Sequence, residues 1–190
     1  FVTLMNLVAD ERILGIGREL FGTDPVFRAT TLWFEPATAY EDGSWHRDIQ
    51  FMHSDEDEQR RIVEEGAERG GCDGMQLQIA LVETADNEYV PGSHLRWDMN
   101  EEYHIRLADA HAHSRSNNMP GAVRIRQQPG DALAFQAQGL HRGRYHADKR
   151  RRTLMLTYTS DRDRSFDYFS DQPWLEASPM MAILPAATQA

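Results

Sequence analysis

The chain has 190 residues, 41% of them hydrophobic, so it can bury the core of one domain. Its net charge of −10 argues against a nucleic-acid or anionic-membrane surface, and no apolar run approaches the ~20 residues of a membrane span. One cysteine, Cys72, excludes an internal disulfide and indicates a reducing compartment, so we expect a cytoplasmic protein.

The first predicted element is a helix over residues 10–21. Asp10 can cap it and Gly22 can end it. A strand is expected over 26–34, where β-branched and aromatic residues are frequent. The sequence therefore starts with a helix that precedes the first strand of a sheet.

The stretch Gly-Ser-Trp-His-Arg-Asp-Ile-Gln-Phe, residues 43–51, also favours a strand. Two turn-forming residues open it, and tryptophan, isoleucine and phenylalanine suit a half-buried sheet surface. Side chains two apart share one face of a strand. We therefore expect His46 and Asp48 to lie on one face, as ligands of one metal ion or as a buried ion pair.

A polar helix is expected over residues 54–71, with Ser54 as its N-cap and acidic residues in its first turn. The following strands are short and are separated by turns with proline or glycine. They are predicted at residues 75–83, 122–126, 132–137 and 152–160. Such a series indicates a sandwich or a barrel.

Residues 98–120 begin polar and helix-like and continue as a connection rich in Asn, Ser and His. Connections of this length in a compact barrel are often functional loops. We therefore expect the segment to be a mobile cover over an open barrel end, where it would exclude water.

The chain has eight histidines, and most are expected to be solvated or structural. His111 and His113 form an H-x-H in a polar segment, so solvent exposure is favoured over a metal role. His141 differs, because it follows a predicted strand and a Pro-Gly-Asp turn. With His46 and Asp48 it completes two imidazoles and one carboxylate, which occupy three positions on iron(II) and leave three open. Zinc is the competing metal, although an H-E-x-x-H helix is absent.

Several stretches, in this order along the chain, together resemble one family. They are W-H-R-D, L-Q-I-A-L-V-E, V-P-G-S-H-L-R-W-D, P-G-D-A-L-A-F-Q-A-Q-G-L-H-R-G and R-R-R-T-L-M-L-T-Y-T-S. From about residue 30 to 160 the chain is similar to the iron(II)/2-oxoglutarate-dependent oxygenases of the phytanoyl-CoA dioxygenase family, which includes ectoine hydroxylase. The resemblance implies a mostly β fold, a double-stranded β-helix (a cupin-like jelly roll) with flanking α-helices. We expect a single oxygenase domain over residues 1–190; its start at Phe1 rather than a methionine allows for natural ends beyond both termini.

Residue by residue, the resemblance implies that His46, Asp48 and His141 are the catalytic metal ligands, with Fe(II) and 2-oxoglutarate as cofactors. It also implies that Arg152, eleven residues after His141, binds the distal carboxylate of 2-oxoglutarate. We expect Arg152 to point into the barrel, because it begins an apolar strand. Gln76 is a second candidate for cofactor binding.

Two positions depart from the family pattern. Gly143 stands where a small hydroxyl residue is frequent, and Glu35 lies where a basic or amide residue is frequent. Neither change touches the metal ligands. Both bear on how the co-substrate is bound.

The implied function is a dioxygenase that hydroxylates an unactivated C–H bond of a small-molecule substrate and releases succinate and CO2. Its expected partners are that substrate and dioxygen, with no nucleic acid and no membrane. Two other classes stay open: a non-catalytic jelly-roll metal- or ligand-binding protein, which Glu35 and Gly143 favour, and a zinc hydrolase on a cupin-like barrel. The sequence names neither the substrate nor the oligomeric state.

Overall fold

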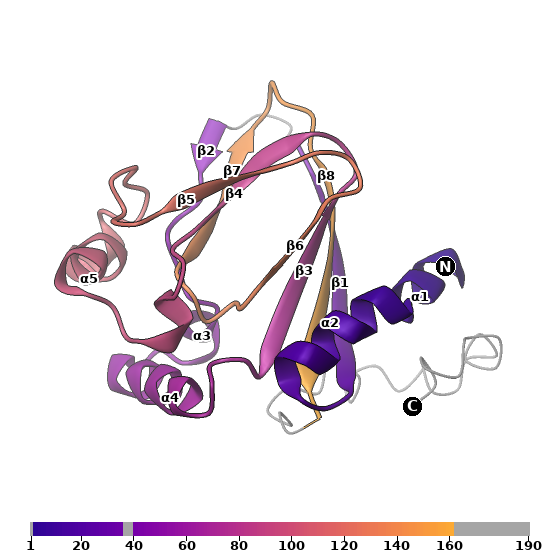
Figure 1. The fold of residues 1–190 in the computed structure, drawn as a ribbon. Helices are drawn as coiled ribbons and strands as arrows, with labels where there is room; N and C mark the ends of the chain where they lie inside the picture. Colours follow the sequence, from indigo (N-terminus) through magenta and orange to yellow (C-terminus); the bar gives the residue numbers. More distant parts are fainter. Residues whose placement is uncertain (1, 36–39, 162–190) are drawn as a thin grey trace. The chain divides into compact units, whose positions relative to one another are not determined.

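The computed structural model describes residues 2–35 and 40–161 (Figure 1). Its helices are α1 (Val2–Val8), α2 (Glu11–Phe21), α3 (Ile49–Met52), α4 (Glu56–Glu68), α5 (Asn100–Arg106) and α6 (Ala108–His111), with a 3-10 helix, η1, at Ser93–Leu95. Its strands are β1 (Pro25–Phe34), β2 (Tyr40–Asp42), β3 (Gly74–Ala80), β4 (Thr84–Tyr89), β5 (Val123–Gln127), β6 (Ala132–Phe135), β7 (His141–His146) and β8 (Arg152–Ser160).

Within the described residues, these strands form two four-stranded sheets, in the orders β1-β8-β3-β6 and β2-β7-β4-β5. Most consecutive strands pass from one sheet to the other, as in a jelly roll. The pairs β2 with β7, β3 with β6, β4 with β5 and β4 with β7 are antiparallel. The expected mostly β fold with flanking helices is confirmed.

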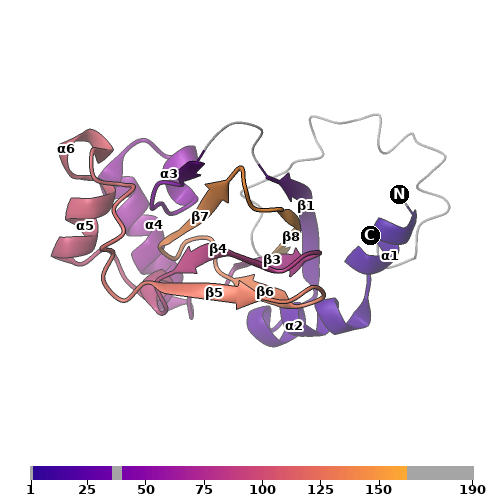
Figure 2. The same cartoon turned by 90° about the horizontal axis from the view of Figure 1, so that it is seen from above.

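Contacts between residues divide the chain into two compact units. Of the described residues, the first unit contains 2–31, 73–75 and 156–161, and the second contains 32–35, 40–72 and 76–155. In the first unit, the Tyr158 hydroxyl donates to the Val8 carbonyl over 2.8 Å. The second unit holds every predicted site residue, and Figures 1 and 2 show its helices α3 to α6 at one end of the β2-β7-β4-β5 sheet. A single domain over the whole chain stays a prediction.

Capping side chains explain where the two long helices begin. Asp10 accepts a hydrogen bond from the Arg12 backbone N–H over 2.9 Å at the start of α2, and Gly22 ends this helix at a φ of 69°. At α4 the cap is Asp55 rather than Ser54, because the Asp55 carboxylate accepts from the Glu58 N–H over 2.8 Å. The predicted helices are therefore confirmed, with one cap shifted by a residue.

The strand predicted over 43–51 is wrong. β2 ends at Asp42, His46 forms only an isolated bridge with His141, and Asp48 has helical dihedrals (φ −59°, ψ −27°) as the residue before α3. The N–H groups of Gln50 and Phe51 donate to the Arg47 and Asp48 carbonyls, over 3.0 Å each. These local turns satisfy the backbone that a sheet ladder would otherwise have paired.

The sequence pattern did not predict three strands, β2, β4 and β7, and of these β4 and β7 are rich in buried or half-buried polar residues. On β4, Asp86, Asn87 and Glu88 are all buried, with exposed fractions of 7%, 6% and 7%. The apolar alternation that signals a strand is missing, since polar side chains pair with one another inside the fold. β7, His-Arg-Gly-Arg-Tyr-His, has the same character.

An apolar cluster lies next to the predicted metal ligands. Trp45 and Leu140, which precede His46 and His141 in the chain, are 1% and 0% exposed. They belong to one buried cluster with Val90, Ile105 and Met119. A close-packed core of this kind fixes the backbone of the residues that follow.

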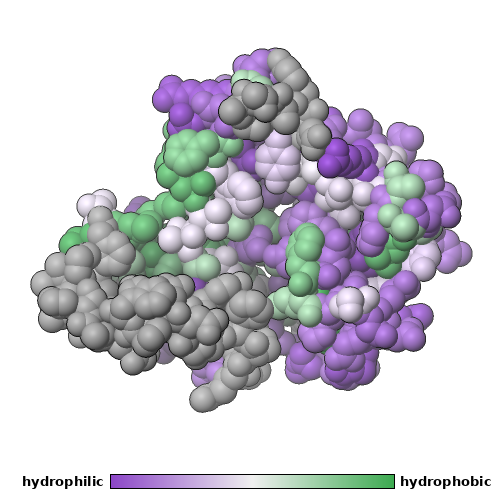
Figure 3. Space-filling model, turned by 180° about the vertical axis from the view of Figure 1, so that it is seen from behind, coloured by the Kyte–Doolittle hydropathy of each residue, from purple (hydrophilic) through white to green (hydrophobic). Residues whose placement is uncertain are grey.

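The described part of the face drawn in Figure 3 is largely polar. Figure 3 shows hydrophilic residues, drawn in purple, over much of the visible described part, with smaller green apolar groups between them. No helix in the described part of the chain is long and apolar enough to span a bilayer.

Candidate metal centre

His46, Asp48 and His141 bring three potential metal ligands together. Asp48 Oδ1 lies 3.5 Å from His46 Nε2 and 3.4 Å from His141 Nε2. All three ligand atoms lie within 4.8 Å of one another. Two atoms that are each about 2.1 Å from one ion can be at most about 4.2 Å apart, so both measured pairs fit a shared ion.

The backbone holds the two histidines in register. The His46 N–H donates to the His141 carbonyl, and the His141 N–H donates back to the His46 carbonyl, each over 3.0 Å. Asp48 is placed separately, because its N–H donates to the Ala137 carbonyl over 3.0 Å. One reciprocal bridge and one turn, rather than a continuous strand, thus build the site.

Both imidazoles are oriented for metal binding through Nε2. Nδ1 of His46 lies 2.7 Å from the Ser44 carbonyl, and Nδ1 of His141 lies 2.9 Å from the Gly139 carbonyl. A carbonyl can only accept, so each Nδ1 carries the proton and each Nε2 presents its lone pair. These carbonyls fix the tautomer that a metal requires.

The electrostatics favour a neutral His46 beside an ionised Asp48. Burial, with the nearby His141 as a smaller cause, lowers the pKa of His46 to about 4. Burial alone would raise the pKa of Asp48, but the adjacent His141 and His46 outweigh it and lower that pKa below its usual range. Neutral His and ionised Asp are the forms that bind a metal ion.

Gln76 lies beside the candidate metal ligands and contacts one of them, Asp48. From β3, its Nε2 donates to Asp48 Oδ2 over 2.7 Å. The other oxygen, Oδ1, is the one that faces the two histidines. Gln76 was expected to bind the cofactor, and the structure places it as an outer partner that orients a ligand carboxylate.

Arg152, which was expected to point into the barrel, pairs with Glu35 instead of lying free for a co-substrate. Its side chain is 30% exposed, whereas the side chain of Arg151 is only 7% exposed. Glu35 also accepts from the Arg151 backbone N–H over 3.0 Å. Backbone N–H donors, with Arg152 a smaller cause, lower the pKa of Glu35 to about 2, so this carboxylate stays ionised and neutralises Arg152.

Arg151 is buried without hydrogen bonds at two of its nitrogens. Its guanidinium lies over the rings of Trp33 and Tyr145, at 5.3 and 4.7 Å from the centroids. Nε lies 3.6 Å from Asp86 Oδ2, but neither Nε nor Nη1 makes a hydrogen bond. Tyr145 shares its strand face with His141, four residues earlier on β7, so Arg151 faces the same side of that strand.

Among the other buried polar atoms without hydrogen bonds are Thr153 Oγ1, Gln78 Nε2 and Asn87 Oδ1. Gln78 follows Gln76 on the same face of β3, and Asn87 Nδ2 donates to Gln78 Oε1 over 2.7 Å. Buried polar groups nearly always have partners, so Arg151 and Thr153, two residues apart on the chain entering β8, are candidates to bind a polar ligand. A guanidinium and a hydroxyl are suitable donors to a carboxylate.

Gly143 is explained by its neighbour on β7. A Cβ at this position would lie 2.5 Å from the Tyr145 hydroxyl. The tyrosine ring that contacts Arg151 thus occupies the space in which a small hydroxyl side chain would stand. The departure at Gly143 is therefore coupled to the packing around Arg151.

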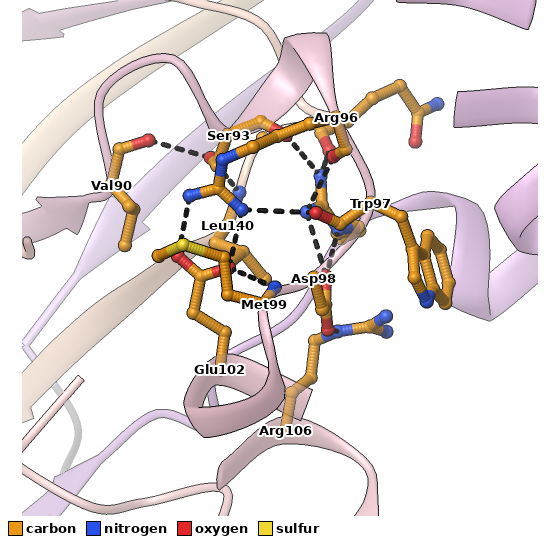
Figure 4. Close-up of polar contacts among 12 residues, drawn as sticks. Val90, Ser93, Arg96, Trp97, Asp98, Met99, Glu102, Arg106 and Leu140 are labelled. Atoms are coloured by element: carbon orange, nitrogen blue, oxygen red, sulfur yellow. Dashed lines mark hydrogen bonds and ion pairs between the residues drawn. The ribbon is translucent and has the colours of Figure 1, made fainter. Parts of the chain in front are cut away.

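Between the two ligands of the His46-x-Asp48 motif, Arg47 is fully buried and points away from them. It pairs with Asp98 (Nη2 to Oδ1, 2.8 Å) and donates to the Ser93 carbonyl over 2.8 Å. Asp98 also pairs with the buried Arg106, Nε to Oδ2, over 2.7 Å. Figure 4 shows Asp98 beside Arg106 within this network. The sequence analysis did not predict this network. Its one signal was the position of Arg47 between His46 and Asp48, which directs its side chain away from theirs.

Residues 98–120 are tied to the fold rather than free. Ile105 and Met119 belong to the apolar cluster, and Arg106 is fully buried. The Trp45 N–H donates to the Ser114 carbonyl over 2.7 Å. The segment therefore packs beside the candidate metal ligands, as expected of a cover, and its mobility stays a prediction.

Comparison with known proteins identifies the family. The sequence profile described as phytanoyl-CoA dioxygenase (PhyH) matches residues 2–153. The chain belongs to the phytanoyl-CoA dioxygenase family. No curated protein sequence matches the chain significantly.

Solved structures of similar fold are non-haem oxygenases and related enzymes. They include the non-haem monooxygenase ThoJ as its nickel complex (19% identity, TM-score 0.55, 83% of this chain and 53% of that one) and EctD from S. alaskensis with 2-oxoglutarate and 5-hydroxyectoine (21%, 0.56, 82% and 51%). A third is SnoN, an alpha-ketoglutarate-dependent epimerase of nogalamycin biosynthesis (18%, 0.56, 83% and 56%). The chain thus spans about half the length of these structures and shares the fold of this family's enzymes.

Proposed function

We propose that the chain is an Fe(II)- and 2-oxoglutarate-dependent dioxygenase that hydroxylates an unactivated C–H bond of a small molecule. The observation that carries the proposal is the convergence of His46 Nε2, Asp48 Oδ1 and His141 Nε2 within the reach of one ion. Family membership supports it, as does the 2-oxoglutarate in the EctD structure.

The residues fit iron and its co-substrate. Two imidazoles and one carboxylate leave three positions open on an octahedral metal, as oxygenases that activate dioxygen require. When bound, iron(II) and 2-oxoglutarate supply the chemistry that consumes dioxygen and yields succinate, CO2 and a hydroxylated product. Within this scheme His46, Asp48 and His141 hold the ion, and Gln76 keeps Oδ1 of Asp48 turned toward it.

For the distal carboxylate of 2-oxoglutarate we propose Arg151, with Thr153 as a second donor. Arg151 Nε and Nη1 and Thr153 Oγ1 are buried without hydrogen bonds, and the two residues share one face of the chain entering β8. A guanidinium binds a carboxylate through two parallel hydrogen bonds. Arg152, the residue that the family spacing favours, already pairs with Glu35.

The proposed reaction can be tested by following dioxygen uptake and succinate release. The chain is loaded with iron(II) under anaerobic conditions and mixed with 2-oxoglutarate and oxygen. We expect slow succinate formation without substrate, its loss in Asp48→Ala, and acceleration by a true substrate from a small-molecule screen. No succinate under any condition, with iron bound, would favour a non-catalytic binding protein. Hydrolytic activity with zinc in the absence of oxygen would favour the hydrolase.

A cytoplasmic location also stays a proposal, which rests on the single Cys72.

A further inference from the structure

A second cluster of metal-ligating side chains lies outside the candidate iron site. His104 belongs to α5, and Asp109 and His113 follow it in the chain. His113 Nε2 lies 3.3 Å from Asp109 Oδ2, and the rings of His104 and His113 stack with centroids 5.1 Å apart. One ligand atom from each of the three lies within 4.8 Å of the others. The set has the same donor types as His46, Asp48 and His141 and meets the same 4.8 Å limit.

An unusual backbone brings these side chains together. Asp109, Ala110 and His111 have φ values of 52°, 53° and 66°. Three consecutive non-glycine residues in the left-handed region are strained by roughly 1–2 kcal/mol each. Such strain persists only where the surroundings enforce it, and it is frequent at ligand sites.

His111 does not take part in the cluster. Its Nδ1 lies 2.7 Å from the Arg106 carbonyl, so it donates to the end of α5. The H-x-H of the sequence is thus divided between two roles. His111 binds the last carbonyl of α5, and His113 stacks on His104.

We propose that His104, Asp109 and His113 form a second metal site, which binds a divalent transition ion, with Zn2+ as the best match. Imidazole suits zinc, whereas calcium and magnesium prefer oxygen ligands throughout. The side chains of Asp109 and His113 are 68% and 49% exposed, so water can complete a tetrahedral shell. The ion would join α5 to the strained turn and hold that turn in place.

The site adjoins the segment that supports the iron ligands. Residues 114–117 follow His113 directly, and the carbonyls of Ser114 and Ser116 accept from the Trp45 N–H (2.7 Å) and Trp45 Nε1 (2.9 Å). Arg142 Nη2 donates to Asn117 Oδ1 over 2.6 Å. Trp45 and Arg142 precede His46 and follow His141, respectively. An ion on His113 would therefore order a segment that contacts both ligand-bearing stretches.

The test is zinc binding by the untagged full chain in equilibrium dialysis. The wild type should bind two Zn2+ per chain, and the double variant Asp48→Ala/His141→Ala should bind one. Adding Asp109→Asn to that double variant should lower its remaining zinc affinity at least tenfold. Asparagine is the matched replacement, because it keeps the size of the side chain and tolerates a left-handed φ. His53→Ala, outside both clusters, should change nothing.

Asp109→Asn in the otherwise unchanged chain provides a second measurement. It should reduce the stoichiometry from two Zn2+ to one, with an unchanged circular dichroism spectrum. Zinc binding that is the same with and without Asp109→Asn would overturn the proposal. So would the absence of zinc from a folded Asp48→Ala/His141→Ala variant. Neither outcome depends on catalytic turnover, so the second site can fail while the proposed dioxygenase stands.

Discussion

Gln76 connects a sheet strand to the carboxylate of the candidate metal centre. Its amide donates to Asp48 Oδ2 and leaves Oδ1 facing the two histidines. Partners of this kind fix the orientation of a ligand, and their loss typically weakens metal binding 10–100-fold. We therefore expect Gln76→Ala to lower iron(II) affinity by about that factor, measured by anaerobic titration. Gln128→Ala, an exposed control, should retain the wild-type affinity, and equal affinities in the two variants would contradict the role of Gln76.

We expect the two adjacent arginines, Arg151 and Arg152, to affect the KM for 2-oxoglutarate differently. Arg151→Lys keeps the charge but loses the fork that binds a carboxylate through two hydrogen bonds. It should raise the KM for 2-oxoglutarate about tenfold, since a tenfold change needs only about 1.4 kcal/mol. Arg152→Lys, in a side chain that already pairs with Glu35, should change this KM less than about twofold. The reverse pattern would return the role to Arg152 and refute the assignment to Arg151.

One buried ion-pair network joins Arg47, which lies between His46 and Asp48, to Asp98 and to Arg106 on α5. Asp98 accepts from both Arg47 and Arg106, and all three side chains are 0% exposed. Removing one partner of a buried pair leaves an uncompensated charge, which usually costs about 3–5 kcal/mol. Asp98→Asn should lower the free energy of unfolding by about that amount in urea titrations.

The surface pair of Arg61 with Glu58 is the control for the Asp98 experiment. The side chains of this pair are 53% and 37% exposed, so solvent screens their attraction. Arg61→Ala should lower the free energy of unfolding by less than about 1 kcal/mol. Similar losses in Asp98→Asn and Arg61→Ala would mean that the buried network does not hold these elements together.

Elements with an apolar pattern or clear caps were predictable from the sequence. α2, α4, β1, β3, β5, β6 and β8 lie where they were expected, because their side chains follow a period or a capping rule. The three-residue β2 was expected to be part of a loop, and β4 and β7 were missed because their buried residues are polar and are satisfied by partners distant in the sequence. The three candidate metal ligands were predicted from their chemistry, and they lie close together, although the expected strand around His46 and Asp48 is a bridge followed by a helical turn. Arg151 and Arg152 could not be distinguished without the Glu35 contact, which spans more than a hundred residues.

Iron binding should stabilise the folded chain as a whole, because the ligands meet only in the folded state. An ion at 100 times its dissociation constant adds about 2.7 kcal/mol. For a chain of this size that corresponds to roughly 5–10 °C in Tm. We expect such a shift with anaerobic iron(II) in Asp109→Asn, where the proposed second site is disabled, and almost none in Asp109→Asn/Asp48→Ala. Equal shifts in the two variants would place the iron elsewhere.

The reciprocal backbone bridge between His46 and His141 also bears on how the chain folds. The two residues are about 95 positions apart in the sequence, so their pairing closes a very large loop. Loops of this length form late, because their closure entropy is lost before the contacts reward it. The candidate metal site should therefore be among the last features to assemble during refolding. Slow exchange of the His46 and His141 amide protons would then report that folding is complete, even before any ion is added.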